Sequence, residues 1–349
     1  MDKFRVALSG DFLKPSGEPA FEDFDLSPLR DDPAIEMAFV EPVDGVMPAA
    51  GLEGFDALIL LVAKFGEASV PADGRLSLVA RFGVGYDTVD LDVCTRNGIA
   101  CCITPDGVRR PVATSILTFL LALSHNLMAK DRITREGPSG WAKRSSHMGV
   151  GLVGRTMGSL GIGNIGAEFY RLAAPLGMVH IAHDPYADPA LASALGIELV
   201  SIEDLFRRSD FLSVSCPLNE TTRGIVNAER LALMKPTAYL INTARGPIVD
   251  QKALTEALRE RRIAGAGIDV FEVEPTPAEE EILTLDNVIV TPHALCFTDQ
   301  CFAGIGAADV AAVKAVMAGE VPRGVVNREV LETARWKARL DGYRARVAA

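Results

Sequence analysis

The sequence predicts an α/β protein of two domains, each built on a doubly wound parallel sheet. Apolar runs of strand length alternate with Gly- and Pro-bearing loops and helix-like stretches along nearly the whole chain. A glycine-rich turn, Gly161 to Gly166, follows one such run and opens a helix-like segment, which is typical of a nucleotide-binding sheet. The 349 residues are enough for two domains that each bury a core.

The first half of the chain carries strand-like runs without a glycine fingerprint. We therefore expect a parallel sheet here that is not the nucleotide-binding one. The predicted strands are residues 5–8, 35–40, 57–62, 78–80 and 99–103.

A linker and a long helix are expected between the two sheets. Residues 105–111 resemble a crossing linker, and the apolar-rich stretch 112–130 is long enough for one extended helix. Six further strands are then predicted, the number in a complete dinucleotide-binding sheet, at residues 156–160, 179–182, 211–215, 238–242, 266–270 and 288–290.

The last helices are expected to return to the first half, which lacks a visible closing element. Helical stretches cover residues 298–317 and 328–346. The predicted division is therefore discontinuous, with residues 1–110 and 297–349 in one domain and residues 111–296 in the nucleotide-binding domain.

Composition and charge exclude several classes of function. The formal charge is −11, from 46 acidic and 35 basic residues, and no basic tract is present, which disfavours nucleic acid and anionic membranes as partners. No signal-peptide pattern opens the chain, and no apolar run reaches the ~20 residues that span a bilayer. The six cysteines lack metal-ligand spacing. We expect no metal and a cytoplasmic location.

The glycine turn has the three positions that a pyrophosphate site requires. Gly161 permits the tight turn, Gly163 allows close approach of the backbone to phosphates, and Gly166 lets the helix pack on its strand. The helix N-terminus then offers free N–H groups and partial positive charge. A plain glycine-rich turn is the alternative.

Asp184 ends the next predicted strand, about twenty residues on, where such folds place an acid against the adenosine ribose. Its carboxylate would accept hydrogen bonds from both ribose hydroxyls and repel a 2′-phosphate. Residues 185–188 include no Arg or Lys. NAD is therefore favoured over NADP.

Three ionisable residues follow neighbouring predicted strands: Arg245, Glu274 and His293. Taken singly, each is more often a surface charge, a loop residue or a structural histidine. Because ligands of open α/β sheets bind outside the carboxyl ends of the strands, all three are expected to converge. An Arg that pairs with a carboxylate, a proton-donating His and an orienting Glu suit hydride transfer to a 2-keto acid.

Taken together, these motifs and their order resemble the D-isomer-specific 2-hydroxyacid dehydrogenase family. The segments that carry the resemblance are Gly83–Asp87, Gly161–Gly166, Asn242–Gly246, Asp269–Pro275 and Thr291–His293. The resemblance covers nearly the whole chain. It implies a Rossmann-type cofactor domain and a flavodoxin-like substrate domain.

The resemblance also implies a role for individual residues. Arg245 would bind substrate, and His293, paired with Glu274, would be the acid/base. A long interdomain helix, here within residues 112–130, would form a homodimer. The backbone of Val84 and Gly85 would bind the substrate carboxylate. The cofactor would be contacted by Asn164 and Ile165 at the pyrophosphate, by Asp184 at the ribose and by Asp269 at the nicotinamide amide. Pro217 and Thr243 would line the cofactor cleft.

The sequence departs from the family at three places. Thr114 replaces a common Glu, and Arg109 and Arg110 precede it, a change of charge that favours a substrate with an extra anionic group. Bulky residues, Leu295, Cys296 and Phe297, follow His293 and are expected to reshape the pocket wall.

Lys64 is either a surface lysine or a contact to the far end of the substrate.

The predicted function is NAD-dependent hydride transfer between a 2-keto acid and its D-2-hydroxy acid. Glyoxylate, hydroxypyruvate and phosphoglycerate-like substrates remain open, because they differ only in the tail. A second class also remains open, in which an NAD-sensing dimer of this superfold acts as a corepressor.

Overall fold

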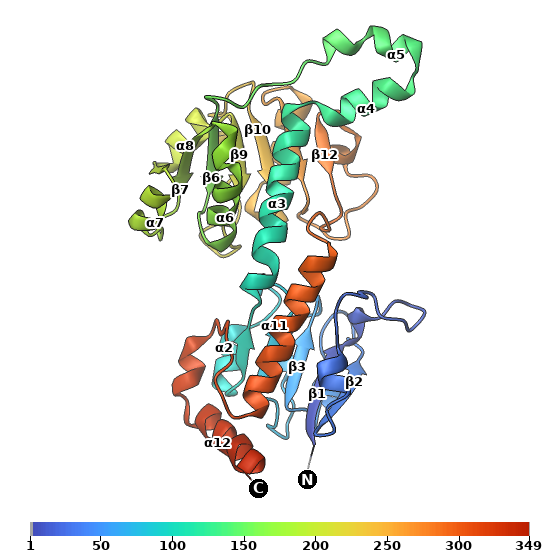
Figure 1. Cartoon of the computed structure of the whole chain (residues 1–349), viewed down its shortest axis with the longest axis vertical. Coiled ribbons are helices and arrows are strands. Elements are labelled where there is room, and N and C mark those ends of the chain that lie inside the picture. The colour runs from blue at the N-terminus through green and yellow to red at the C-terminus, as the bar shows by residue number, and fades with distance from the viewer. Residues whose placement is uncertain (1–2, 349) are drawn as a thin grey trace. The chain divides into compact units, whose positions relative to one another are not determined.

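The computed structural model describes residues 3–348, with side chains described for residues 3–346. The chain forms two compact units (Figure 1). The first unit runs to Val108 and resumes at Thr298, and the second unit is Arg109–Phe297. The expected boundaries, 110/111 and 296/297, lie within two residues of this division.

The first unit contains a five-stranded parallel sheet in the order β2-β1-β3-β4-β5. Numbered along the chain, this is the 2-1-3-4-5 order of flavodoxin-like sheets, with its topological switch point between β1 and β3. The predicted strands are confirmed. Their bounds are β1 Phe4–Ser9, β2 Ile35–Val40, β3 Ala57–Leu60, β4 Leu78–Arg81 and β5 Ala100–Cys102.

The C-terminal segment returns to this sheet, as the sequence indicates. Helix α11 (Asp299–Met317) packs on β4, and the backbone after α11 bonds to the end of β5, where the Val326 N–H donates to the Cys101 carbonyl at 2.9 Å. The other helical segments of this unit are η1 Gly10–Phe12, α1 Ser27–Arg30, η2 Ala49–Leu52, η3 Glu67–Ser69, α2 Leu91–Arg96, η8 Arg328–Glu332 and α12 Ala334–Ala348.

The expectation that no apolar run is long enough to span a bilayer is corrected for α11. By length and composition, this helix meets the requirement, as does the bent pair α3 (Pro105–Ser124) and α4 (Leu127–Arg135). Half of the most apolar stretch of α11 is buried inside the structure, and Asp309 is fully buried near the middle of the helix. These features are those of a core helix in the first unit.

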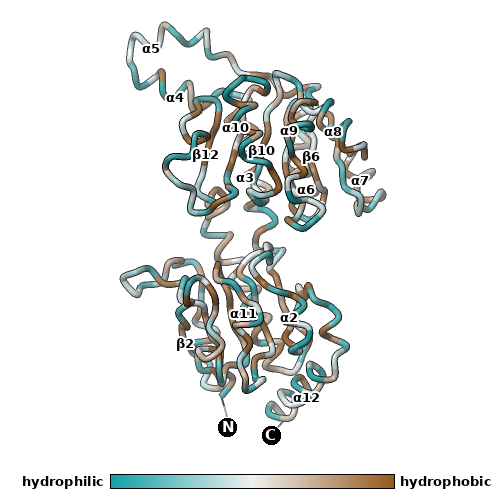
Figure 2. Tube along the Cα trace, turned by 180° about the vertical axis from the view of Figure 1, so that it is seen from behind, coloured by the Kyte–Doolittle hydropathy of each residue, from teal (hydrophilic) through white to brown (hydrophobic). Residues whose placement is uncertain are grey.

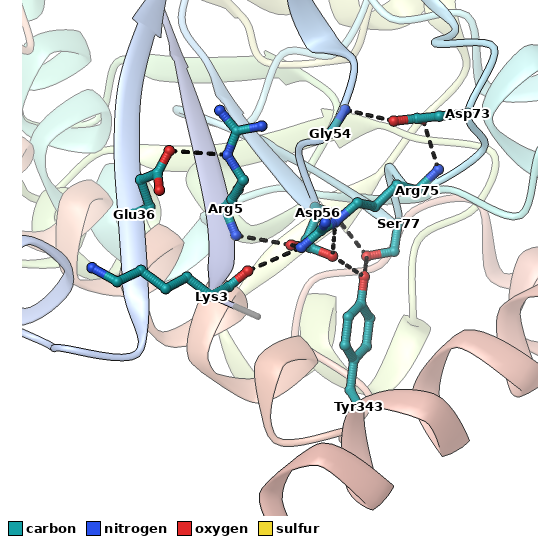
Figure 3. Close-up of polar contacts among 9 residues, drawn as sticks. All are labelled: Lys3, Arg5, Glu36, Gly54, Asp56, Asp73, Arg75, Ser77 and Tyr343. Atoms are coloured by element: carbon teal, nitrogen blue, oxygen red, sulfur yellow. Dashed lines mark hydrogen bonds and ion pairs between the residues drawn. The ribbon is translucent and has the colours of Figure 1, made fainter. Parts of the chain in front are cut away.

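A polar network connects α12 to the residues that precede β3 and β4 in the first unit (Figure 3). The Asp56 carboxylate accepts hydrogen bonds from Arg75 Nη2 at 2.8 Å and from the Tyr343 hydroxyl at 3.0 Å. The Ser77 hydroxyl lies 3.1 Å from the same Tyr343 oxygen. Burial and the neighbouring Asp56 charge raise the pKa of Tyr343, so its hydroxyl keeps the proton that it donates.

The second unit contains a seven-stranded parallel sheet in the order β12-β11-β10-β9-β6-β7-β8. Numbered from β6, this order is the 3-2-1-4-5-6 arrangement of a Rossmann-type sheet with one strand added at the far edge. Its strands are β6 Thr156–Leu160, β7 Val179–His183, β8 Ile197–Leu199, β9 Phe211–Val214, β10 Tyr239–Asn242, β11 Gly265–Ile268 and β12 Val288–Val290.

The six strands predicted for the second unit are confirmed, but the number six is wrong. The strand that the sequence did not indicate is β8, at the opposite edge from β12. It has three residues, of which Glu198 and Leu199 are exposed. An edge strand of this kind leaves no apolar run in the sequence.

The interpretation of residues 105–130 also needs correction. Residues 105–111 are not a linker but the first turns of α3, and Pro111 is accommodated inside the helix. The expected helix does not continue to residue 130, because Asn126 takes a left-handed conformation (φ 55°) and α4 begins at Leu127. Within the second unit, α4 and α5 (Pro138–Ala142) project from the body of the unit (Figures 1 and 2).

Two apolar clusters cover the two faces of the second sheet. On one face, Phe119 of α3 and Phe169 are fully buried, and on the other face Phe206 and Leu254 are buried. The remaining helical segments are η4 Arg144–Ser146, α6 Asn164–Ala173, η5 Ala174–Leu176, α7 Pro189–Ala194, α8 Ile202–Arg208, α9 Ala228–Leu231, η6 Gly246–Ile248, α10 Gln251–Arg259 and η7 Glu281–Thr284.

The network of Figure 3 yields a stability prediction. Tyr343→Phe removes the hydroxyl group that donates a hydrogen bond to Asp56, so the buried carboxylate has one donor fewer. The free energy of unfolding should therefore fall by about 1–2 kcal/mol. Urea unfolding followed by circular dichroism measures the change. Tyr186→Phe is the matched control, because Tyr186 is 90% exposed. Equal midpoints for both variants would contradict this role of Tyr343.

Candidate active site

The glycine turn lies between β6 and α6 and has the geometry that the sequence predicts. Gly161 has φ +96°, which L-residues with side chains rarely adopt, and a Cβ there would lie 2.9 Å from the Ser215 carbonyl oxygen. A Cβ on Gly166 would lie 2.8 Å from the Gly161 carbonyl oxygen. By contrast, a Cβ on Gly163 would meet nothing within 4 Å. Two glycines are therefore required by close packing, while Gly163 leaves open space at the N-terminus of α6.

This open space faces the first turn of a ten-residue helix. Asn164 and Ile165 are the first two residues of α6, and the N–H groups of a first turn have no partner within their helix. The N-cap position, Gly163, offers no side chain to occupy these donors. The turn therefore fits the pyrophosphate of a dinucleotide, as a helix N-terminus favours bound anions.

Asp184 follows β7 and lies against the glycine turn. Its Oδ2 accepts a hydrogen bond from the Ile162 N–H at 3.0 Å, and its Oδ1 accepts one from the Tyr186 N–H at 2.9 Å. The carboxylate is thus fixed beside the turn, at the place expected for the ribose contact. Pro217 follows β9, the strand that neighbours β6 at the switch point, and its carbonyl accepts a hydrogen bond from the Thr222 hydroxyl at 2.6 Å.

A side-chain-supported turn presents Arg245 at the carboxyl end of β10. The buried Asn242 amide spans this turn, accepting from the Ala244 N–H and donating to the Arg245 carbonyl, both at 3.0 Å. The two residues inside the turn, Thr243 and Ala244, are partly exposed. Gly246 is required next, since a Cβ there would lie 1.9 Å from the Phe271 backbone. This close approach joins the turn after β10 to the turn after β11.

Asp269 shapes the segment that carries the predicted acid/base. Its buried Oδ1 accepts hydrogen bonds from the Thr291 hydroxyl at 2.6 Å and from the N–H groups of Ala294 and Leu295 at 3.0 and 3.1 Å. Its carbonyl accepts the His293 N–H at 2.7 Å. Burial raises the pKa of Asp269, and these hydrogen bonds oppose that rise. The sequence suggests no such structural role for this residue.

His293 pairs with Glu274, as the sequence predicts. His293 Nδ1 lies 2.8 Å from Glu274 Oε2, and Glu274 Oε1 accepts the Phe271 N–H at 2.9 Å. His293 has φ +55°, an uncommon conformation for a residue with a side chain. It is held there by the bonds to Asp269.

The charges around Glu274 keep it ionised. Burial raises the pKa of this carboxyl, but the hydrogen bonds from His293 and Phe271 and the positive charge of Arg245 together lower it below its usual value. Arg245 Nη1 itself donates to the Ala244 carbonyl at 2.7 Å. Because Arg245, Glu274 and His293 follow β10, β11 and β12, which are neighbouring parallel strands, all three lie at the carboxyl edge of one sheet.

The predicted substrate residues Val84 and Gly85 lie in the first unit, in the turn after β4. Gly83 has φ +118°, and its N–H donates to the Thr104 hydroxyl oxygen at 3.0 Å. The Val84 and Gly85 N–H groups have no acceptor among the described residues. The turn therefore presents two available donors.

The structure accounts for part of the departures from the family pattern. Arg110 Nε pairs with Glu168 Oε1 of α6 at 2.9 Å, so its charge is already matched by a nearly buried carboxylate. The exposed Thr114 donates to the Arg110 carbonyl at 2.9 Å. Leu295 packs against the core of the second unit, whereas Phe297 is half exposed. No sequence signal identifies Glu168 as the partner of Arg110.

Fold and site together define an oxidoreductase that uses a dinucleotide cofactor. A Rossmann-type sheet with an open phosphate turn binds the cofactor, and an Arg–Glu–His cluster at the same edge suits carbonyl reduction. Among the described residues, no group of His, Cys, Asp and Glu side chains is arranged to hold a metal ion.

Comparison with known proteins gives the family. The family model of the D-isomer specific 2-hydroxyacid dehydrogenase NAD binding domain matches residues 117–294. The chain belongs to this family and is an NAD-dependent D-2-hydroxyacid dehydrogenase. Nothing in these comparisons supports the corepressor alternative.

Three relatives illustrate the range of the family. A glyoxylate reductase of Thermococcus onnurineus is 39% identical over 79% of this chain and 84% of its own length. A D-3-phosphoglycerate dehydrogenase of Mycobacterium tuberculosis is 36% identical over 93% of this chain, which spans only 60% of that longer protein. The structure of an NADPH-dependent glyoxylate/hydroxypyruvate reductase from Sinorhizobium meliloti, in complex with NADP and malonate, is similar with a TM-score of 0.80 and 27% identity over 96% of this chain and 98% of the other.

The His293–Glu274 pair yields a prediction for the pH profile. Glu274→Gln replaces a carboxylate that stays charged above its lowered pKa, so the protonated imidazole loses its partner. Turnover at pH 7 should fall about 10²-fold, and the optimum for keto-acid reduction should move to lower pH. Steady-state rates between pH 5 and 9 measure both changes.

The matched control for this measurement is Glu272→Gln, an exposed residue in the same turn. If Glu274→Gln keeps the wild-type profile, Glu274 does not orient or stabilise the acid/base.

Proposed function

We propose that this protein reduces a 2-keto acid to its D-2-hydroxy acid with NADH, and catalyses the reverse reaction, with Arg245, Glu274 and His293 as catalytic residues. The observation that carries this assignment is the 2.8 Å contact between His293 Nδ1 and Glu274 Oε2, with Arg245 in the same charge cluster. An acid/base without its orienting carboxylate, or without a nearby cation, would not favour this chemistry.

The chain's own residues supply the proton and the binding of charge. His293 uses Nδ1 to bind Glu274, which leaves Nε2 as the atom that gives its proton to the substrate carbonyl oxygen. Arg245 holds the carbonyl or carboxylate and stabilises negative charge as it develops on the oxygen. The nicotinamide, when bound, supplies the hydride to the keto carbon. In oxidation, His293 Nε2 accepts the hydroxyl proton instead.

Several residues of the second unit would hold the cofactor. The turn of Gly161, Gly163 and Gly166, with Asn164 and Ile165, fits the pyrophosphate, and Asp184 fits the ribose. We assign Pro217 and Thr243 to the walls of the cofactor site and Asp269 to the neighbourhood of the nicotinamide amide. The backbone of Val84 and Gly85, in the first unit, would bind the substrate carboxylate.

NAD is proposed as the preferred cofactor over NADP. Both oxygens of Asp184 already accept backbone hydrogen bonds, so its negative charge is fixed beside the turn and would repel a 2′-phosphate. The Sinorhizobium meliloti relative holds NADP, so the preference differs within the fold. Rates with NADPH in place of NADH measure it, and equal rates would remove the role of Asp184.

A homodimer is proposed through the region of residues 112–130, in α3 and α4, and the structure adds α5, which packs against α4, to this region. These elements expose large apolar side chains on one projecting part of the second unit, including Leu127 and Met128, each about half exposed, and Trp141, which is 64% exposed. Exposed apolar clusters of this size mark interaction surfaces. A cytoplasmic location, and the lack of nucleic-acid and membrane partners, remain predictions from charge and composition.

Removal of Arg245 tests the proposed function most directly. Arg245→Ala should lower turnover about 10³-fold, because the developing oxyanion loses its cation, while NADH affinity changes little. NADH oxidation at 340 nm over a panel of 2-keto acids measures turnover, and NADH fluorescence titration measures binding. Arg207→Ala, in an exposed ion pair with Asp204, is the control. Unchanged turnover in Arg245→Ala would exclude the assigned role.

The dimer has its own test. Charges placed in the apolar patch, Leu127→Glu with Met128→Glu, should convert the dimer to a monomer in light scattering, because buried unpaired charge is costly at an interface. Val43→Glu, at an exposed apolar position of the first unit, should leave the mass unchanged. A wild-type monomer would contradict the proposal.

A further inference from the structure

We infer that the substrate is a 2-keto acid with a bulky apolar tail, branched or aromatic, and that the carboxyl edge of the first unit's sheet selects this tail. The inference rests on the proposed function and adds the substrate class to it. Three features of the first unit lead to it: a cluster of phenylalanines, an apolar turn at the switch point, and an internal carboxylate that takes the N–H groups an anion would need.

The phenylalanine cluster lies beside the turn that presents Val84 and Gly85. Phe82 directly precedes this turn, and its ring stacks on that of Phe302, from the first turn of α11, with 5.8 Å between centroids. The ring of Phe21 stacks on Phe302 at 4.2 Å and on Phe82 at 6.3 Å. Phe12 and Phe24 complete the cluster from the segment after β1.

One of the five rings of this cluster reaches the surface. Phe12, Phe24, Phe82 and Phe302 are buried, whereas Phe21 is partly exposed. The buried rings fix Phe21 from below in a stacked arrangement, which lowers the entropy lost when a second apolar group packs on it. Phe21 is thus a preformed apolar contact close to the predicted carboxylate-binding turn.

The turn after β3 continues the apolar character of this edge. It lies at the switch point between β1 and β3, where ligands of doubly wound sheets bind. Its first residues are Leu61, which is partly exposed, and Val62, which is 65% exposed. An exposed valine at such a position gives a tail an apolar surface instead of a hydrogen-bonding one.

Asp11 makes this edge unsuitable for an anionic tail. Its Oδ2 accepts the N–H groups of Val62 and Ala63 at 2.9 and 3.0 Å, and its Oδ1 accepts the Ser9 hydroxyl. These N–H groups are the ones that would bind a phosphate or carboxylate at the switch point, and they are occupied by the protein's own negative charge. A second anion placed there would meet repulsion from Asp11.

The bases near this edge do not compensate. Arg81, at the end of β4, donates to the Phe82 carbonyl. Its positive charge opposes the rise that burial causes in the pKa of Asp309. Lys64 is exposed, and its backbone bonds to Gly45 and Met47 hold the turn in place. A flexible exposed lysine offers at most a weak, screened attraction. The apolar contacts therefore set the class of tail.

Steady-state kinetics on the protein test the inference. The kcat/KM values for NADH-dependent reduction of phenylpyruvate and 4-methyl-2-oxopentanoate should exceed those of glyoxylate and pyruvate by 10-fold or more, since each buried apolar group contributes one to two orders of magnitude. The values for 2-oxoglutarate and 3-phosphohydroxypyruvate should be lower still.

Two variants connect this preference to the named residues. Phe21→Ala should lower kcat/KM for phenylpyruvate about 10-fold more than for glyoxylate. Val62→Arg should lower the phenylpyruvate value and raise that of 2-oxoglutarate by 10-fold or more. Val153→Ala, an 85% exposed valine in the second unit, is the matched control and should change neither ratio.

The outcomes separate this inference from the proposed function. If glyoxylate or an anionic keto acid is the best substrate, or if Phe21→Ala leaves the ratio unchanged, the apolar-tail inference is overturned while the reaction stands. If no member of the panel is reduced although NADH binds, the proposed function itself is overturned.

Discussion

The buried carboxylate of Asp269 is the constraint on which the catalytic edge depends. One oxygen accepts three hydrogen bonds from the segment 291–295, and the carbonyl of the same residue accepts the His293 N–H. A buried carboxylate is costly unless its lone pairs are satisfied, so the surrounding chain must close on it. This closure fixes His293 in a left-handed conformation and directs its imidazole to Glu274. The position of the acid/base is therefore a consequence of folding.

The sequence indicates at which strand ends the candidate site residues lie, but it does not indicate which side chains hold them there. The sequence alone shows that Arg245, Glu274 and His293 each follow a predicted strand. Parallel strands bring their carboxyl ends to one edge of a sheet, so the shared edge can be predicted as well. The support given by Asn242, Asp269 and Glu168 is not visible, since it depends on side-chain directions across different strands. Long buried strands were predictable from their apolar runs, whereas β8, three residues at an exposed edge, was not.

Helix ends were the least predictable part of the fold. The residues before Pro111 have the composition of a linker, yet they form the first turns of α3, and Pro111 itself lies inside the helix. The break between α3 and α4 requires a left-handed backbone conformation at Asn126. Asparagine adopts this conformation more readily than most residues, but its presence in a sequence does not predict it. In both places, the local sequence alone does not fix the conformation of the backbone.

The two sheets differ in whether the backbone N–H groups at the switch point are available to bind an anion. At the switch point of the second unit, Gly163 carries no side chain, and the first-turn N–H groups of α6 are left for a bound anion. At the switch point of the first unit, Asp11 occupies the N–H groups of Val62 and Ala63 with its own carboxylate. An anion site is thus kept open in one sheet and closed in the other. In the proposed function, the Arg–Glu–His cluster handles only the keto-acid group, so the chemistry would be independent of the tail. Specificity could then change at the closed site without altering the residues proposed to transfer the proton.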